Sequence, residues 1–155
     1  MPSRRRRATE LAVVARDRVL VDSGAWIALV RLGDQHHSEA DRLFRRAAAR
    51  RIPLVTTNLI IAEVHRFILF HVGIRAAALL LDRIDASQLL TTEFATAAHH
   101  AAARRWIARL SDQVISYTDA VSFAVMEATR CTAAMSFDRD FVTAGFRLWQ
   151  PAGDG

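Results

Sequence analysis

Short apolar runs alternate with longer stretches of helical periodicity between residue 18 and residue 149. Runs rich in β-branched and apolar residues predict strands at residues 18–21, 52–56, 88–92 and 133–137, with a fifth at 146–149. Apolar residues that recur every three to four positions predict helices at residues 24–32, 36–51, 58–72, 74–85, 93–110 and from 118 onward. Strands that alternate with helices indicate an α/β fold, in which a central parallel sheet of four to five strands carries helices on both faces.

Four acidic residues lie singly within apolar stretches of this pattern, and they are Asp22, Glu63, Asp119 and Asp138. An ionised carboxylate that is buried without a partner is costly, so each of them needs a reason. Asp22 and Asp138 come at the ends of the first and fourth predicted strands, while Glu63 and Asp119 fall in the first turns of predicted helices. Because functional clefts of parallel sheets lie at the carboxyl ends of the strands, we expect the four side chains to converge there.

Each of these acids also has a structural explanation when it is considered alone. Asp22 can cap the following helix, and Asp119 can be an N-terminal acid that the helix dipole favours. Glu63 is harder to explain in this way, because apolar residues surround it in the sequence. Asp138 and Asp140 are two positions apart and do not project the same way from a helix. We therefore assign Asp138 to the strand end and Asp140 to a supporting contact.

A site built from carboxylates alone selects a hard cation, Mg²⁺ with Mn²⁺ as a substitute, over Zn²⁺. Such an ion suits the hydrolysis of phosphodiesters, because it can activate water, bind the phosphate and stabilise the leaving oxygen. The spacing of the six histidines does not build a competing site, and surface or structural roles are predicted for His36, His37, His65, His71, His99 and His100.

The rest of the chain is strongly basic. The formal net charge is +5, and all 21 basic residues are arginine. When the four acids are set aside, 12 acidic residues face those 21 arginines. A basic surface around an acidic, metal-loaded pit suits a polyanion such as RNA. A coding bias toward arginine and alanine is the alternative explanation for part of this composition.

Composition also excludes several classes of protein. Receiver domains and haloacid-dehalogenase-like phosphatases both need a lysine, and this chain has none. It also lacks the GK[ST] sequence of a P-loop and the GxSxG sequence of a serine hydrolase. No apolar run approaches the roughly 20 residues of a membrane span. Cys131 is the only cysteine, so no intrachain disulfide forms, and we expect a cytoplasmic protein without a membrane segment.

The 155 residues fit one domain. We predict that residues 19–150 form it, that residues 1–18 are a flexible Arg-rich tail, and that residues 151–155 are a disordered C-terminus. The tail is predicted either to contact RNA or to result from an upstream translation start. Its apolar part, Leu11 to Ala15, is too short for the core of an export signal.

Residues 18–150 resemble PIN-domain ribonucleases, in particular the VapC-type toxins of bacterial toxin–antitoxin pairs. The resemblance rests on four motifs in the order of the family. Each motif is weak alone, and the ordered set is specific. The motifs are Val21-Asp22-Ser23, Ile61-Ala62-Glu63, Tyr117-Thr118-Asp119-Ala120 and Ser136-Phe137-Asp138-Arg139-Asp140-Phe141. Ser23 replaces a threonine that is frequent in the family, which keeps the hydroxyl, and the long Arg-rich start departs from the pattern.

The resemblance implies a three-layer α/β/α domain and a metal-dependent endoribonuclease that cuts structured RNA. It implies a homodimer that a VapB-like antitoxin protein inhibits. Asp22, Glu63, Asp119 and Asp138 would bind one or two Mg²⁺ ions and carry catalysis. The residues that would orient these carboxylates are Ser23, Thr118, Ser136 and Asp140. A housekeeping RNA-processing nuclease and a non-catalytic RNA-binding scaffold remain the alternatives.

Overall fold

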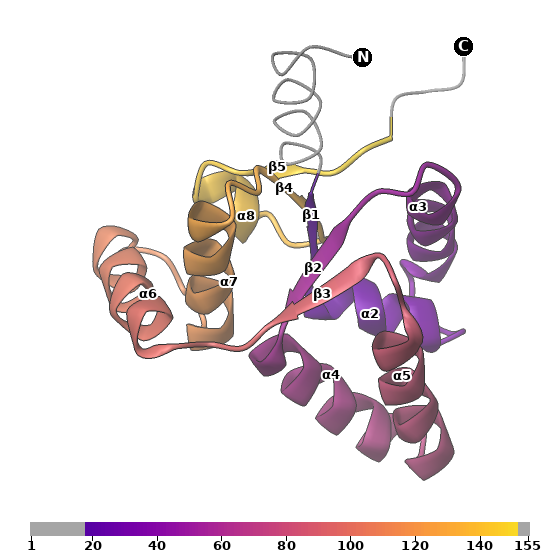
Figure 1. Ribbon diagram of the computed structural model, residues 1–155. Coiled ribbons are helices and arrows are strands. Elements are labelled where there is room, and N and C mark those ends of the chain that lie inside the picture. The colour runs from indigo at the N-terminus through magenta and orange to yellow at the C-terminus, as the bar shows by residue number, and fades with distance from the viewer. Residues whose placement is uncertain (1–17, 152–155) are drawn as a thin grey trace, which may run out of the picture.

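A computed structural model describes residues 18–151 of the chain. A five-stranded parallel sheet occupies its centre, with the strand order β3-β2-β1-β4-β5 (Figure 1). The strands are β1 (Val19–Val21), β2 (Leu54–Thr57), β3 (Leu90–Glu93), β4 (Ala133–Met135) and β5 (Arg147–Leu148). Every residue of β1, β2 and β4 is buried, as expected for central strands that are covered on both faces.

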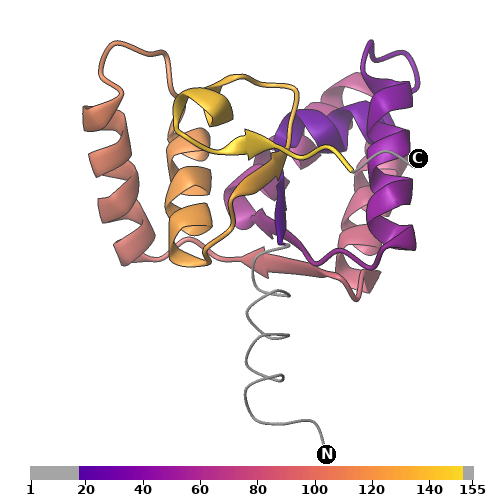
Figure 2. The same ribbon diagram turned by 90° about the horizontal axis from the view of Figure 1, so that it is seen from above.

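The helices form the two outer layers of a three-layer α/β/α fold. Figures 1 and 2 show α6, α7 and α8 on one side of the sheet and α2 to α5 on the other. The bounds are α2 (Ser23–Val30), α3 (His37–Ala49), α4 (Asn58–His71), α5 (Ile74–Ala86), α6 (Ala97–Arg109), α7 (Tyr117–Ala128) and α8 (Asp140–Thr143). The predicted fold class is confirmed, including the fifth strand.

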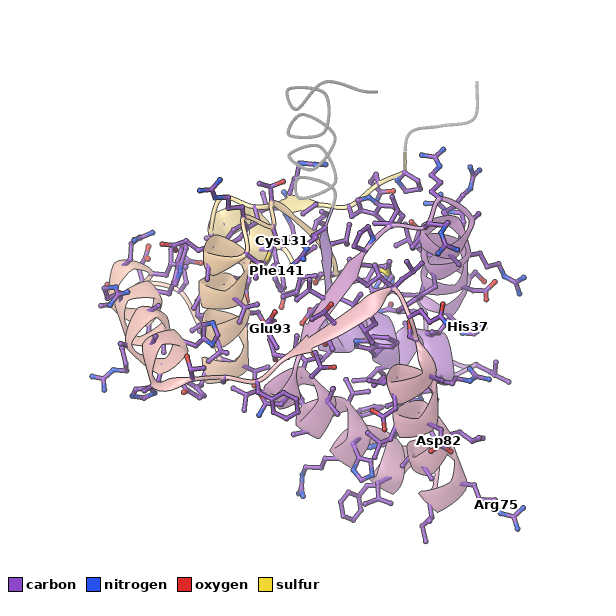
Figure 3. All side chains as sticks on the ribbon, in the orientation of Figure 1. His37, Arg75, Asp82, Glu93, Cys131 and Phe141 are labelled. Atoms are coloured by element: carbon purple, nitrogen blue, oxygen red, sulfur yellow. The ribbon has the colours of Figure 1, made fainter. Side chains whose placement is uncertain are left out.

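The core is best developed around α7, in which residues 120–126 are all buried. The ring of Phe123 packs edge-on against Phe141, with centroids 5.2 Å apart, and Figure 3 shows Phe141 beside α7. Cys131 is a buried free thiol two residues before β4, and its Sγ donates to the carbonyl of Arg18 at 3.1 Å. These contacts hold β4 and the segment after it, which carries two of the candidate acids.

Several predicted boundaries differ from the observed ones. The fourth strand ends at Met135 rather than at residue 137, so Asp138 lies in a loop. Helix α7 begins at Tyr117, one residue before the predicted start, and is capped by Ser116, whose Oγ accepts from the backbone N–H of Asp119 at 3.0 Å. Of the two residues in the sequence that could cap α4, Thr57 and Asn58, it is Thr57 that does so, because its hydroxyl accepts from the N–H of Ile60.

The predicted tail and C-terminus lie outside the described residues, apart from Arg18 and Pro151. Those two predictions stay open. Within the part that the structure describes, no helix combines the length and the apolar composition that crossing a membrane requires.

Candidate active site

The site lies where the carboxyl ends of β1 and β4 meet. Val21 pairs with Met135 in the parallel register, and the N–H of Asp22 extends the pairing to the carbonyl of Met135 at 3.0 Å. The backbone of Asp22 is therefore held by the sheet, independently of any contact that its side chain makes. That side chain is buried, with an exposure of 4%.

Both carboxylate oxygens of Asp22 are held by neighbouring residues. Oδ1 accepts from the N–H of Ser23 at 2.8 Å and so caps α2. Oδ2 accepts from the hydroxyl of Ser136 at 2.8 Å. The carboxylate of Asp22 therefore has both of the roles that the sequence suggested. It caps α2, and it lies at the carboxyl end of β1.

Glu63 joins this group from α4. The hydroxyl of Ser23 lies 3.2 Å from Oε1 of Glu63 and 3.5 Å from Oδ1 of Asp22. Because a hydroxyl has one proton, Ser23 donates to one carboxylate at a time and links the two. Glu63 lies in the second turn of α4 and is exposed, which corrects the expectation of a first-turn residue surrounded by apolar groups. The neighbours Ile60 and Val64 face the core, while Glu63 lies to one side of that face and reaches Ser23.

Asp119 lies in the first turn of α7, where the helix dipole stabilises a carboxylate. One carboxylate oxygen each from Asp119, Asp138 and Asp140 lies within 4.8 Å of the others. Asp140 therefore belongs to the same cluster as Asp138, although the sequence assigned it only a supporting contact. The loop brings the two together, because the N–H of Asp140 donates to Oδ1 of Asp138 at 2.9 Å.

The acids repel one another. Burial, above all, raises the pKa of Asp22 to about 7, and the charges of Asp119 and Glu63 add to this effect against the hydrogen bonds from Ser136 and Ser23. Burial also raises the pKa of Asp119, to which Asp138, Asp140 and Glu63 contribute by repulsion. The pKa of Asp140 is raised by desolvation and by Asp138. These repulsions connect all five acids into one electrostatic unit.

The five acids have no basic counterpart among the described residues. The ion pairs there are Arg42–Glu39 and Arg45–Asp41, both within α3 and both on the surface. A cluster of oxygen donors without such a counterpart fits a hard divalent cation, which would relieve the repulsion. The donor set contains no thiol and no imidazole, so its chemistry fits Mg²⁺ or Mn²⁺.

The predicted supporting hydroxyls divide into two groups. Ser23 and Ser136 both contact Asp22, as described above. Thr118 contributes its carbonyl, which accepts from Ser122 Oγ at 3.0 Å, and within the described residues its hydroxyl makes no hydrogen bond to the acids. Ser116 holds Asp119 instead. The spacing Ser-x-x-Asp at the start of a helix is the sequence signal that could have revealed it.

Five of the six histidines make structural contacts, namely His36, His37, His71, His99 and His100. His37 Nδ1 lies 2.7 Å from the carbonyl of Ala28, and His99 completes a capping box with Thr96 at the start of α6. His36 stacks on Phe137, with ring centroids 4.3 Å apart and an interplanar angle of 7°. That last contact reaches the loop of Asp138, which the sequence did not indicate.

The fold and the acid cluster agree with the comparison against known families. Residues 19–147 match the family described as the PIN domain. The chain therefore belongs to the PIN-domain family.

Among individual proteins, the chain is similar to "23S rRNA-specific endonuclease VapC20" from two strains of Mycobacterium tuberculosis. The identity is 34% over 128 residues, which cover 83% of this chain and 95% of the relative. The crystal structure of that bacterium's VapC20, described as a sarcin-ricin loop cleaving toxin, superposes with a TM-score of 0.75 at 32% identity. It covers 86% of this chain and 99% of its own.

A second solved structure, FitAcB from Neisseria gonorrhoeae, superposes with a TM-score of 0.60 at 13% identity. It covers 86% of this chain and 97% of that chain. At this identity the similarity concerns the fold alone.

Proposed function

We propose that this chain is a metal-dependent endoribonuclease that hydrolyses phosphodiester bonds in structured RNA, as the toxin of a VapBC-like toxin–antitoxin pair. The observation that carries the proposal is the cluster of Asp119, Asp138 and Asp140, which repels the nearby Asp22 and Glu63 and has no basic counterpart among the described residues. Membership of the PIN-domain family supports the reaction, and the relatives named VapC20 support the class of substrate.

The carboxylates of Asp119, Asp138 and Asp140 would hold Mg²⁺, with Mn²⁺ as a substitute, and Asp22 and Glu63 would complete the oxygen donors. When bound, the ion supplies an activated water and stabilises the charge that develops on the phosphate. Ser136 and Ser23 hold Asp22 in one orientation, so its charge does not rotate away from the pit.

Purified protein tests the reaction directly. With Mg²⁺ it should cut cellular RNA, and with a chelator it should not. Asp22→Asn and Asp119→Asn should each abolish cutting, while circular dichroism shows an unchanged fold, because asparagine at position 22 can still cap α2 and Ser116 still caps α7. Asn variants that cut as fast as the parent would refute this assignment. Protein that binds RNA and never cuts it would favour the scaffold.

The first substrate to test is 23S ribosomal RNA, because the relatives named VapC20 are named for it. Mapping new 5′ ends across total RNA after induction would identify the cleaved bond. A cut found only in messenger or transfer RNA would change the proposed substrate but not the proposed nuclease activity.

The proposed partner is a VapB-like antitoxin, and the proposed assembly is a cytoplasmic homodimer. A small open reading frame just upstream should encode the antitoxin. Its co-expression should relieve growth arrest and inhibit cutting by the purified chain. Induction that leaves growth unchanged would favour a housekeeping RNA-processing nuclease.

A further inference from the structure

Helix α4 carries a stripe of charged and aromatic side chains that begins at Glu63. Arg66, Phe67, Phe70 and His71 follow at helical spacing on the same face. With Glu63 they line a groove of about 320 Å³, which we call the α4 groove. The groove therefore includes an acid of the candidate active site. Its other lining residues follow along α4, which Figure 1 shows running away from the strand ends.

Of the two phenylalanines in the α4 groove, Phe67 is partly buried and packs against the core, whereas Phe70 is exposed. The buried face of α4 is made by Ile60, Val64 and Ile68. Phe70 lies off that face, and 69% of its surface is exposed. Exposing a phenyl ring to this extent forfeits the free energy of burying it, so a ligand that covers Phe70 would recover that free energy.

Two guanidinium groups lie over the aromatic rings of the groove. Cζ of Arg66 is 5.2 Å from the ring centroid of Phe70, and Cζ of Arg31 is 5.8 Å from that of Phe67. Neither arginine forms an ion pair among the described residues. The groove thus offers two cations without a carboxylate partner there, each beside an aromatic ring.

This combination fits a single strand of RNA better than a peptide. Phosphates need cations, and unstacked bases need aromatic or guanidinium planes. An acidic peptide would satisfy the arginines, but it offers a planar group only where it carries an aromatic residue, whereas every nucleotide carries both a phosphate and a planar base. The groove also begins beside Glu63. An RNA strand that is cut at the acids must continue over the neighbouring surface, and the groove is part of that surface.

We infer that the α4 groove binds the RNA strand on one side of the scissile phosphate. Phe70 stacks on a base, while Arg31 and Arg66 hold phosphates. One helical turn advances about 5.4 Å, so Arg66 and Phe70, one and two turns beyond Glu63, contact successive nucleotides. The inference rests on the proposed endoribonuclease activity.

Steady-state cleavage of an RNA oligonucleotide that spans the mapped cut tests the inference. Phe70→Ala and Arg66→Ala should each raise KM roughly fivefold or more, with kcat within about twofold of the parent. Leu79→Ala and Arg75→Ala are the matched controls. Leu79 lines a separate groove between α2 and α5, and Figure 3 shows Arg75 at the outer end of α5.

Truncating the oligonucleotide locates the contact. Removing the nucleotides on one side of the cut should raise KM of the parent and erase the difference between parent and Phe70→Ala. Removing the other side should leave that difference intact. The Asp22→Asn protein, which is expected to bind RNA without cutting it, should show the same loss of affinity when Phe70→Ala is added.

Three outcomes would overturn the inference. If Phe70→Ala and Arg66→Ala have the same KM values as the controls, RNA does not bind in the groove. A parent that is dimeric and a Phe70→Ala variant that is monomeric, with unchanged RNA affinity, would assign the groove to a second copy. If Phe70→Ala loses affinity only for the antitoxin, the α4 groove binds the antitoxin. A parent that cuts no RNA would instead fail the proposed function itself.

Discussion

At the scale of single residues, Asp22 combines a structural role with an electrostatic cost. It caps α2, which asparagine or serine would do equally well without a charge. Its carboxylate is nevertheless buried among other acids, and the pKa is raised to about 7. A charge that the cap does not need, and that burial penalises, is best explained by a cation that binds it.

The metal-free protein should therefore lose stability as the pH rises. The folded state keeps a proton on Asp22 that the unfolded state releases near its ordinary value of 3.8, so the free energy of unfolding falls between about pH 4 and pH 7. The change from 3.8 to about 7 corresponds to roughly 4 kcal/mol. Asp119 and Asp140 add to the fall, because their pKa values are raised too.

Urea denaturation in EDTA at several pH values measures this fall. Asp22→Asn should reduce it and should be more stable than the parent at pH 8. Asp82→Asn, an exposed change on α5, should behave as the parent (Figure 3). Adding Mg²⁺ at pH 8 should restore stability to the parent. Equal free energies at pH 5 and pH 8 would contradict the burial of an ionisable Asp22.

Asp140 should bind metal as strongly as Asp138. Both belong to the three-acid cluster with Asp119, so Asp138→Asn and Asp140→Asn should each lower Mn²⁺ affinity by roughly tenfold or more. Calorimetry with Mn²⁺ measures the affinities, and Asp82→Asn serves again as the control. A large loss for Asp138→Asn with little change for Asp140→Asn would return Asp140 to the supporting role that the sequence assigned.

At the scale of elements, the β4–α8 connection is held from both sides. On the inner side, Ser136 Oγ donates to Asp22 and accepts from the N–H of Asp138 at 3.0 Å. On the outer side, the ring of Phe137 stacks on His36, which lies just before α3. The loop that carries the candidate metal ligands Asp138 and Asp140 is therefore held between a strand end and another layer of the fold.

Loss of the stack between His36 and Phe137 should leave Asp138 and Asp140 less firmly positioned. His36→Ala should weaken Mn²⁺ binding by roughly twofold to tenfold, the range expected for one aromatic pair. His36→Phe retains a stacking ring and should restore the affinity. The matched control is His71→Ala, which removes a similar stack on Phe67, with centroids 4.0 Å apart, outside the acid loop.

The result would contradict this role of His36 in either of two cases. Equal losses for His36→Ala and His71→Ala would indicate a general destabilisation. No rescue by His36→Phe would mean that the ring of His36 acts in some way other than stacking. Thermal melting of the four proteins separates unfolding from a local change at the site.

At the scale of the whole molecule, periodicity predicted the layers well and the local geometry poorly. Alternating strand and helix signals were sufficient for the parallel sheet, because connections between parallel strands leave few topologies. The same topology brought Asp22, Asp119 and Asp138 to one edge. The exposure of Glu63 was missed, because a helix with apolar residues on most of its faces gives a weak amphipathic signal. Asp140 and Ser116 were missed, because loop and cap contacts have no period.

The predicted tail adds a property that belongs to the whole chain, namely its net charge. Arg4, Arg5, Arg6 and Arg7 supply four of the 21 arginines, so replacing all four with glutamine lowers the formal charge from +5 to +1. If the tail contacts RNA, the quadruple variant should bind more weakly at low salt, because fewer counterions are released on binding.

The salt dependence distinguishes contact from general attraction. With Asp22→Asn in both proteins to prevent cutting, Kd for RNA should be measured between 50 and 200 mM salt, a range in which a few phosphate contacts change affinity strongly. Each lost contact to a single strand should reduce the slope of log Kd against log salt by about 0.7. A slope reduced by one or more would assign the tail to RNA. If Kd changes by the same factor at every salt concentration, so that the slope is constant, the tail only attracts RNA at long range. If the parent and the quadruple variant give identical curves, the explanation by an upstream translation start is favoured.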